Sequence, residues 1–201
     1  MKIKILTALF ALALLGCAAK GTAPTVYTLD LNPELAADYS GPAVPLTLLI
    51  ENVATHEALK SRRILASPAP YRSSYRAGVE WAESAETLLG TTIFSYLSPR
   101  LKKAVPPAFK NRVNGEYTLL IYLDALTQVK RGPDWFAVLK LNYELVKTKG
   151  GNSLLSGRFA KSAVLLDGSI ESFAQAESAL LTEWLEKITA ELQTVANGPK
   201  E

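Results

Sequence analysis

The chain contains very little of what catalytic and metal-binding proteins depend on. Its 201 residues include one cysteine, Cys17, and one histidine, His56. A single cysteine excludes a disulfide within the chain and a cysteine-based zinc site. Enzymes that move protons near neutral pH most often use histidine, and His56 lies in a polar stretch typical of a solvent-facing loop. These shortages argue against an enzyme.

The motifs of common catalytic and nucleotide-binding sites are also missing. The sequence has no G-x-S-x-G, no P-loop, no G-x-G-x-x-G and no H-E-x-x-H. Its acidic residues are scattered, so no carboxylate metal site is predicted. Asp124 stands in an apolar strand pattern and is best explained by an edge or a strand end, while Gly150 and Gly151 indicate a hairpin turn. We therefore expect no catalytic residue, no metal and no cofactor.

An excess of charge of one sign is absent too. The chain has 22 basic and 19 acidic residues, a net charge of +3, and removal of residues 1–16 would lower it to +1 because Lys2 and Lys4 are lost. A balance so close to neutral gives no electrostatic footprint for nucleic acid and no polybasic attraction to acidic lipid.

The N-terminus has the pattern of an export signal. Lys2 and Lys4 precede an apolar run, residues 5–15, which is too short to cross a bilayer. The run ends in Leu14-Leu15-Gly16-Cys17, which resembles the lipobox of bacterial lipoproteins. The resemblance implies a diacylglycerol on the Cys17 thiol, cleavage just before it, and an acyl chain such as palmitate on the new amino terminus. The alternative is an ordinary secretory signal that happens to end at a cysteine.

Two or three acyl chains on Cys17 would hold the protein on a membrane, because two such signals already suffice for stable anchoring. Ala18 follows the cysteine, whereas enterobacterial lipoproteins of the inner membrane typically have Asp there. By that resemblance, the protein lies on the outer membrane and faces the periplasm. We predict a signal peptide at residues 1–16 and a flexible, lipidated tether at residues 17–42, with a short strand at residues 26–29.

Residues 43–197 are predicted to form a single domain. Apolar stretches bounded by prolines predict buried strands at residues 44–50 and 64–67. Apolar residues at every second position predict three longer strands. These strands cover residues 117–126, 135–145 and 154–166, with a turn at residues 149–152. Short connections between them predict an antiparallel meander.

Two amphipathic helices complete the prediction. Ser84 is placed to cap the first helix, and Pro99 ends it. The second helix follows Asp167-Gly168-Ser169 and stops at Asn197-Gly198-Pro199. The expected fold class is α+β: a two-layer domain with a mainly antiparallel sheet of about five strands and both helices packed on one face.

Aromatic and basic residues alternate in residues 71–81. Tyr71, Tyr75 and Trp81, with Arg72 and Arg76 between them, have the composition of a protein-interface hot spot. We predict that Tyr71, Tyr75 and Trp81 bind a partner. The alternative is that Trp81 packs beneath the helix that it precedes.

The order of these parts resembles the ABC-type transport auxiliary lipoproteins, the PqiC-like (YmbA-like) family. The resemblance covers nearly the whole mature chain. Residues 53–61 depart from the proline-containing connection associated with much of the family. The motifs that carry the resemblance are Tyr27-Thr28-Leu29, Arg63-Ile64-Leu65, Trp81-Ala82-Glu83 and Leu154-Leu155-Ser156-Gly157-Arg158-Phe159.

The resemblance implies a non-enzymatic role in an MCE/ABC-type lipid transport system that supports membrane integrity. The implied partner is an MCE-domain protein, whose conduit would carry phospholipid across the periplasm and would dock on residues 71–81 or on an exposed sheet edge. An assembly or pilot lipoprotein for an outer-membrane β-barrel or secretion pore is the alternative. A lipid carrier ranks third, because two helices over one sheet enclose too little space. The transported lipid, its direction and the oligomeric state, a homo-oligomer included, stay open.

Overall fold

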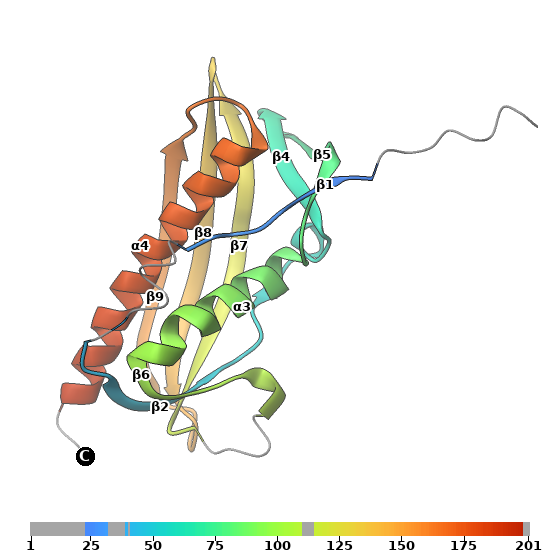
Figure 1. The fold of residues 1–201 in the computed structure, drawn as a ribbon. Coiled ribbons are helices and arrows are strands. Elements are labelled where there is room, and N and C mark those ends of the chain that lie inside the picture. Colours follow the sequence, from blue (N-terminus) through green and yellow to red (C-terminus); the bar gives the residue numbers. More distant parts are fainter. Residues whose placement is uncertain (1–22, 32–38, 40, 110–114, 199–201) are drawn as a thin grey trace, which may run out of the picture.

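The computed structural model describes residues 23–31, 39, 41–109 and 115–198. The predicted signal peptide and Cys17 lie outside the described residues. A nine-stranded sheet carries two long helices on one face (Figure 1). This arrangement confirms an α+β domain with both helices on the same side of the sheet.

The elements have the following bounds. The strands are β1 (Thr25–Tyr27), β2 (Val44–Ile50), β3 (Ala54–Thr55), β4 (Arg63–Ala69), β5 (Arg72–Trp81), β6 (Leu101–Val105), β7 (Tyr117–Arg131), β8 (Asp134–Lys147) and β9 (Ser153–Val164). The helices are α3 (Ala85–Leu97) and α4 (Ile170–Asn197), with single 3-10 turns at η2 (Glu57–Leu59), η3 (Ser98–Arg100) and η4 (Pro107–Phe109).

The long strand β7 organises the sheet. One of its edges pairs with the antiparallel strand β8 over its whole length. Its other edge pairs in turn with β2, β3 and β4, all of them parallel to it. Beyond these, β6 lies outside β2, while β5 and then β1 lie outside β4. On one side of β7 the sheet continues through β8 to β9. On the other side it divides into two arms, β2–β6 and β4–β5–β1, which we call the fork.

The sheet has nine strands and is mixed in direction, so the expectation of a mainly antiparallel sheet of about five strands fits only in part. The predicted meander of β7, β8 and β9 is confirmed, and β4 and β5 form the other antiparallel pair. Every other pairing is parallel. Parallel strands need long connections, so their partners are remote in sequence, and β1, β3 and β6 are only 3, 2 and 5 residues long.

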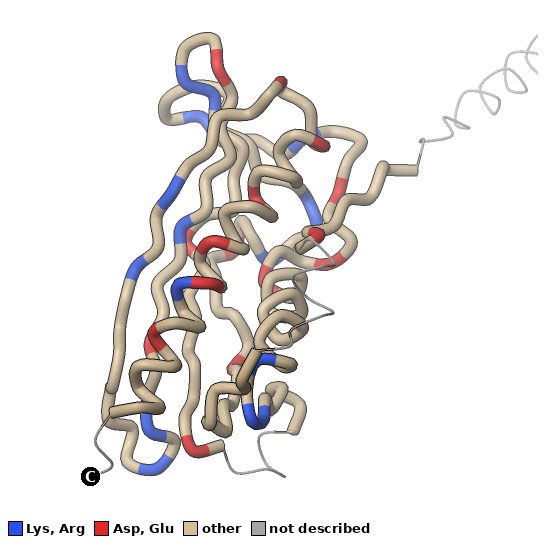
Figure 2. The backbone as a smooth tube through the Cα atoms, turned by 60° about the vertical axis from the view of Figure 1, so that its left-hand side comes forward, with Lys and Arg blue, Asp and Glu red and all other residues tan. Residues whose placement is uncertain are grey.

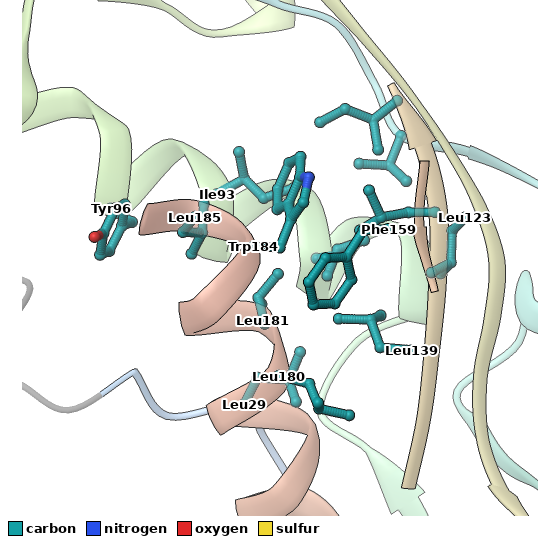
Figure 3. Packing of buried hydrophobic residues seen from close by; sticks show 14 of the residues in the cluster. Leu29, Ile93, Tyr96, Leu123, Leu139, Phe159, Leu180, Leu181, Trp184 and Leu185 are labelled. Carbon is teal, nitrogen blue, oxygen red and sulfur yellow. The ribbon is translucent and has the colours of Figure 1, made fainter. Parts of the chain in front are cut away.

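Side-chain caps start both helices, and the one at Ser84 was predicted. The Ser84 hydroxyl accepts the backbone N–H of Thr87 at α3, and the Ser169 hydroxyl accepts that of Ser172 at α4. The apolar side of each helix faces the sheet. Figure 3 shows Leu181 and Trp184 of α4 in the same packed layer as Phe159 of β9, and all three are buried.

The segment that follows β1 is part of the core. Leu29 and Leu31 are buried, and the backbone N–H of Asp30 donates to the Ser178 hydroxyl of α4 at 3.1 Å. Figure 1 shows this segment crossing the helical side of the molecule toward α4. Burying each leucine contributes about 1.5–3 kcal/mol. Residues 25–31 are therefore not flexible, and the predicted tether of residues 17–42 and the domain start at residue 43 need correction.

The turn between β4 and β5 stores backbone strain. It consists of Pro70 and Tyr71, and Tyr71 has a φ angle of 62°. Left-handed backbone costs a residue with a side chain roughly 1–2 kcal/mol, because its Cβ approaches the following carbonyl oxygen. Tyr71 keeps this conformation although its ring is fully exposed and gains no packing energy from the domain.

Tyr71→Gly is therefore expected to raise the free energy of unfolding by about 0.5–1 kcal/mol, since relief of strain outweighs the greater freedom of glycine in the unfolded chain. Denaturant unfolding of the purified domain measures this. Ser73→Gly, in the adjoining strand, serves as the control and should lower stability. An equal loss of unfolding free energy in both variants would show that the backbone at Tyr71 is not strained.

Glu177 of α4 is a buried acid. It is fully buried, and neither carboxyl oxygen has a hydrogen-bond partner in the described part of the chain. Burial raises the pKa of Glu177 well above its usual range, and the Val138 backbone opposes the shift only in part. Above the pKa of the unfolded chain, the folded protein therefore binds more protons than the unfolded one. Stability is lost as the pH rises toward the folded pKa.

Glu177→Gln should remove this loss. Parent and variant should have similar unfolding free energies near pH 4, and the variant should gain about 1.4 kcal/mol per pH unit over the parent until the folded pKa is reached. Urea unfolding between about pH 4 and 7 measures the difference. A difference that does not change with pH would show that Glu177 is not held protonated.

Candidate docking surfaces

Trp81 is a core residue. Only 1% of its surface is exposed, and its ring packs against Phe173 of α4 with 5.7 Å between centroids. A partner cannot reach this side chain in the folded domain, so the prediction that Trp81 binds a partner is wrong. The alternative, that it packs in the core next to its helix, is the one observed.

Tyr75 is half-buried and held by its neighbours. Its hydroxyl donates to the Ala58 backbone oxygen at 3.1 Å, and the Arg63 guanidinium lies 3.8 Å from its ring centre. These contacts fasten β5 to η2 and β4. Tyr71 alone of the three predicted residues is fully exposed, at the tip of the hairpin.

A backbone irregularity in β5 separates these residues. Tyr75 pairs with Leu65, but Glu80 pairs with Arg63, so β5 gains extra residues between the two positions. Gly78 lies in this interval with a φ angle of 71°. An insertion of this kind turns the following side chains to the other face of a sheet. Trp81 therefore points inward, and residues 71–81 do not present one continuous aromatic surface.

The face of the sheet opposite the helices carries a groove that sequence analysis did not predict. The groove has a volume of about 560 Å³ and runs over the middle of β7, β8 and β9. We call it the open-face groove. Leu120 and Tyr122 lie in it with 39% and 41% of their surfaces exposed. Its lining residues are Ala54, Leu120, Ile121, Tyr122, Asn142, Tyr143, Glu144, Ser156, Gly157 and Arg158.

Asp124 lies beside this groove. It is a bulge residue, because the register of β7 passes from Leu123 to Ala125 without a partner for it. Its carboxylate accepts a hydrogen bond from Asn142 at 2.6 Å, and its backbone oxygen lies 3.1 Å from the His56 ring. The explanation by an edge or a strand end is therefore wrong: the bulge places a carboxylate in the middle of a sheet.

Three turns meet at one end of the sheet, which we call the hairpin end. They are the β4–β5 turn, the β7–β8 turn and the β9–α4 connection (Figure 1). A groove of about 340 Å³ between the first two is lined by Tyr71, Arg72, Lys130 and Arg131, among others. The Gln128 amide of β7 donates to the Gly168 backbone oxygen at 3.1 Å and fastens the third turn to the sheet.

Within the part of the chain that the structure describes, no three His, Cys, Asp or Glu side chains are grouped so that they could hold a metal ion. None of the described helices is both long and apolar enough to cross a membrane. The open-face groove and the groove at the hairpin end are two of several surface hollows in the described residues, and their side chains offer contacts to a surface or a partner.

Comparison with solved structures supports the fold. A Xanthomonas campestris protein of the family DUF330 is similar, with a TM-score of 0.69 and 19% identity over 86% of this chain and 93% of that one. A second solved structure, of an uncharacterised protein, has a TM-score of 0.62 and 15% identity, and the match covers 87% of this chain and 99% of that one. The comparison with curated proteins gives no match.

A family model agrees with the resemblance found in the sequence. Residues 27–189 match the model described as the ABC-type transport auxiliary lipoprotein component. The match begins at the last residue of β1 and ends within α4, so it includes the other eight strands of the sheet, α3 and most of α4. The chain therefore belongs to the ABC-type transport auxiliary lipoprotein family.

Proposed function

We propose that the protein is the outer-membrane, periplasm-facing auxiliary component of an MCE/ABC-type lipid transport system, where it docks the periplasmic conduit without catalysing a reaction. The observation that carries this proposal is the family match over residues 27–189. The lipobox ending at Cys17 supplies the anchor. Diacylglycerol and an N-linked acyl chain on Cys17 hold the protein in the outer membrane.

The anchor keeps the domain close to the membrane. The folded domain begins at Thr25, only eight residues after Cys17. A chain of this length spans at most about 27 Å when fully extended. Because β1 and the segment after it are fixed to β5 and α4, the domain follows the anchor, and the conduit reaches the protein near the membrane surface.

We assign the docking surface to the open-face groove. Leu120 and Tyr122 form an apolar centre, and Asn142, Glu144 and Arg158 surround it with polar groups. An apolar centre with an aromatic residue and a polar rim is the usual anatomy of a protein interface. The adjoining strand β9 pairs only with β8 among the described strands, so its outer edge offers backbone groups to the same partner.

The core supports a docking role over lipid carriage. The space between sheet and helices is occupied by large buried side chains, with Trp81, Phe173 and Trp184 the bulkiest. The grooves lie at the surface instead. Phospholipid is thus proposed to pass through the partner's conduit, with this domain holding the conduit in place.

The test is an affinity pull-down of the intact lipoprotein from crosslinked cells, with the partners identified by mass spectrometry. We expect an MCE-domain protein that is recovered with the parent and lost with Cys17→Ala, which removes the anchor. Leu120→Ala combined with Tyr122→Ala should lower its recovery about tenfold or more, as loss of a hot spot does.

Phe109→Ala is the matched control, because it removes an exposed ring of η4 that does not line the groove. It should leave recovery unchanged. Recovery of an outer-membrane barrel and no MCE-domain protein would replace the proposal with the assembly or pilot role. Undiminished recovery with the groove variant would refute the assigned surface.

A further inference from the structure

The hairpin end exposes two large apolar side chains. Tyr71, at the β4–β5 turn, is fully exposed, and Leu166, in the β9–α4 connection, is 99% exposed. The β9–α4 connection is held in place, since the backbone N–H of Leu165 donates to the Trp135 oxygen at 2.8 Å and that of Leu166 to the Ser172 hydroxyl at 3.0 Å. Leu166 is therefore presented by a fixed segment, and Tyr71 stands on the two-residue turn that the Ala69–Arg72 pair closes.

The same end gathers positive charge. Arg72, Lys130 and Arg131 are exposed and lie around one groove. Figure 2 shows Lys and Arg in the turns at this upper end of the molecule. None of the salt bridges among the described residues involves these three side chains. Two carboxylates, Asp134 and Asp167, lie in or next to the three turns of this end, against the three cations.

The linker length places this end within reach of the anchored membrane. Thr25 pairs with Val79 of β5, seven residues along that strand from Arg72. At about 3.3 Å per residue, the hairpin end lies roughly 23 Å from the start of the domain. The eight Cα–Cα steps from Cys17 to Thr25 span up to about 27 Å. The two lengths match, so lipid chains on Cys17 and the hairpin end can meet one membrane surface.

We propose that the hairpin end is a second membrane contact, which binds the surface of a bilayer rich in anionic headgroups. Tyr71 and Leu166 enter the interface between headgroups and acyl chains, where an amphipathic tyrosine ring is favoured. Arg72, Lys130 and Arg131 pair with lipid phosphates. This contact rests on the proposed anchor at Cys17 and fixes the orientation of the domain, with the open-face groove directed sideways into the periplasm.

The shape of this end favours a membrane over a protein partner. Its apolar groups stand on separate turns, and the groove between two of them is small. A stable protein interface buries a broad and complementary surface. A bilayer accepts isolated apolar tips, because lipid rearranges around each of them. Docking on a membrane also gives a use to the strained, exposed tyrosine at position 71.

The test uses the mature chain with Cys17→Ser, so that no acyl chain contributes to binding. Sedimentation measures its partition onto vesicles of phosphatidylcholine and phosphatidylglycerol in equal parts and onto vesicles of phosphatidylcholine alone. We expect binding to the anionic vesicles that falls with added salt. Lys130→Gln combined with Arg131→Gln should weaken this binding about tenfold or more.

Tyr71→Gly is the second variant. It is expected to stabilise the fold while it lowers vesicle binding several-fold, so a failure to fold cannot explain the loss. Lys147→Gln combined with Lys149→Gln, at the opposite β8–β9 turn, makes the same change in charge and should leave binding intact.

Equal binding to both kinds of vesicle would overturn the proposal. An equal loss of binding in the double variant at positions 130 and 131 and in the double variant at positions 147 and 149 would do the same. So would hairpin-end variants that bind vesicles normally but no longer capture a protein partner from crosslinked cells. The experiments distinguish a failure of the membrane contact from a failure of the proposed docking function. Absent vesicle binding with intact capture of an MCE-domain protein removes this inference alone, and the reverse result removes the proposed function alone.

Discussion

The pairing of β7 along both of its edges is the constraint on which the rest of the structure depends. On one side, β8 follows it from Tyr117 to Arg131 and passes the pairing on to β9. On the other side, three parallel strands share a single edge, and two of them, β2 and β4, carry the two arms of the fork. A shorter β7 would leave either the β2–β6 pair or the β4–β5–β1 group without an attachment. The two surfaces proposed for function both follow from this arrangement: the open-face groove crosses the middle of β7, and the hairpin end is where β7 turns into β8.

The N-terminal segment links the proposed membrane anchor at Cys17 to this framework. Tyr27 donates its hydroxyl to Glu171 at 2.5 Å, while the Ala82 backbone N–H donates to the Tyr27 oxygen at 2.7 Å. The same residue thus contacts the start of α4 and the end of β5. With Leu29 and Leu31 buried beyond it, a force on the proposed anchor would act on the folded domain directly. A short linker of this kind restricts the orientations of the domain on a membrane, which a long tether would leave free.

The sequence predicts well whatever is governed by neighbouring residues. The helix cap at Ser84, the apolar stretch at residues 44–50 and the meander of residues 117–166 all depend on patterns within a few residues. Parallel pairing and core placement depend on partners far away in the chain, as Thr25 with Val79 shows. The bulges at Asp124 and near Gly78 also interrupt the two-residue alternation from which the strands were predicted. Gly78 turns Trp81 into the core, and its position inside a strand pattern is a recognisable signal of a bulge. The cationic cluster at the hairpin end has no sequence signature, because Arg72 and Arg131 are brought together only by the sheet.

The most direct test of the account places a photo-crosslinking residue at position 122 or at position 71 of the full-length lipoprotein in living cells. The account predicts that position 122 forms an adduct with an MCE-domain protein, and that position 71 forms adducts with lipid and none with that protein. An MCE adduct from position 71 with none from position 122 would contradict both the docking surface and the orientation of the domain on the membrane.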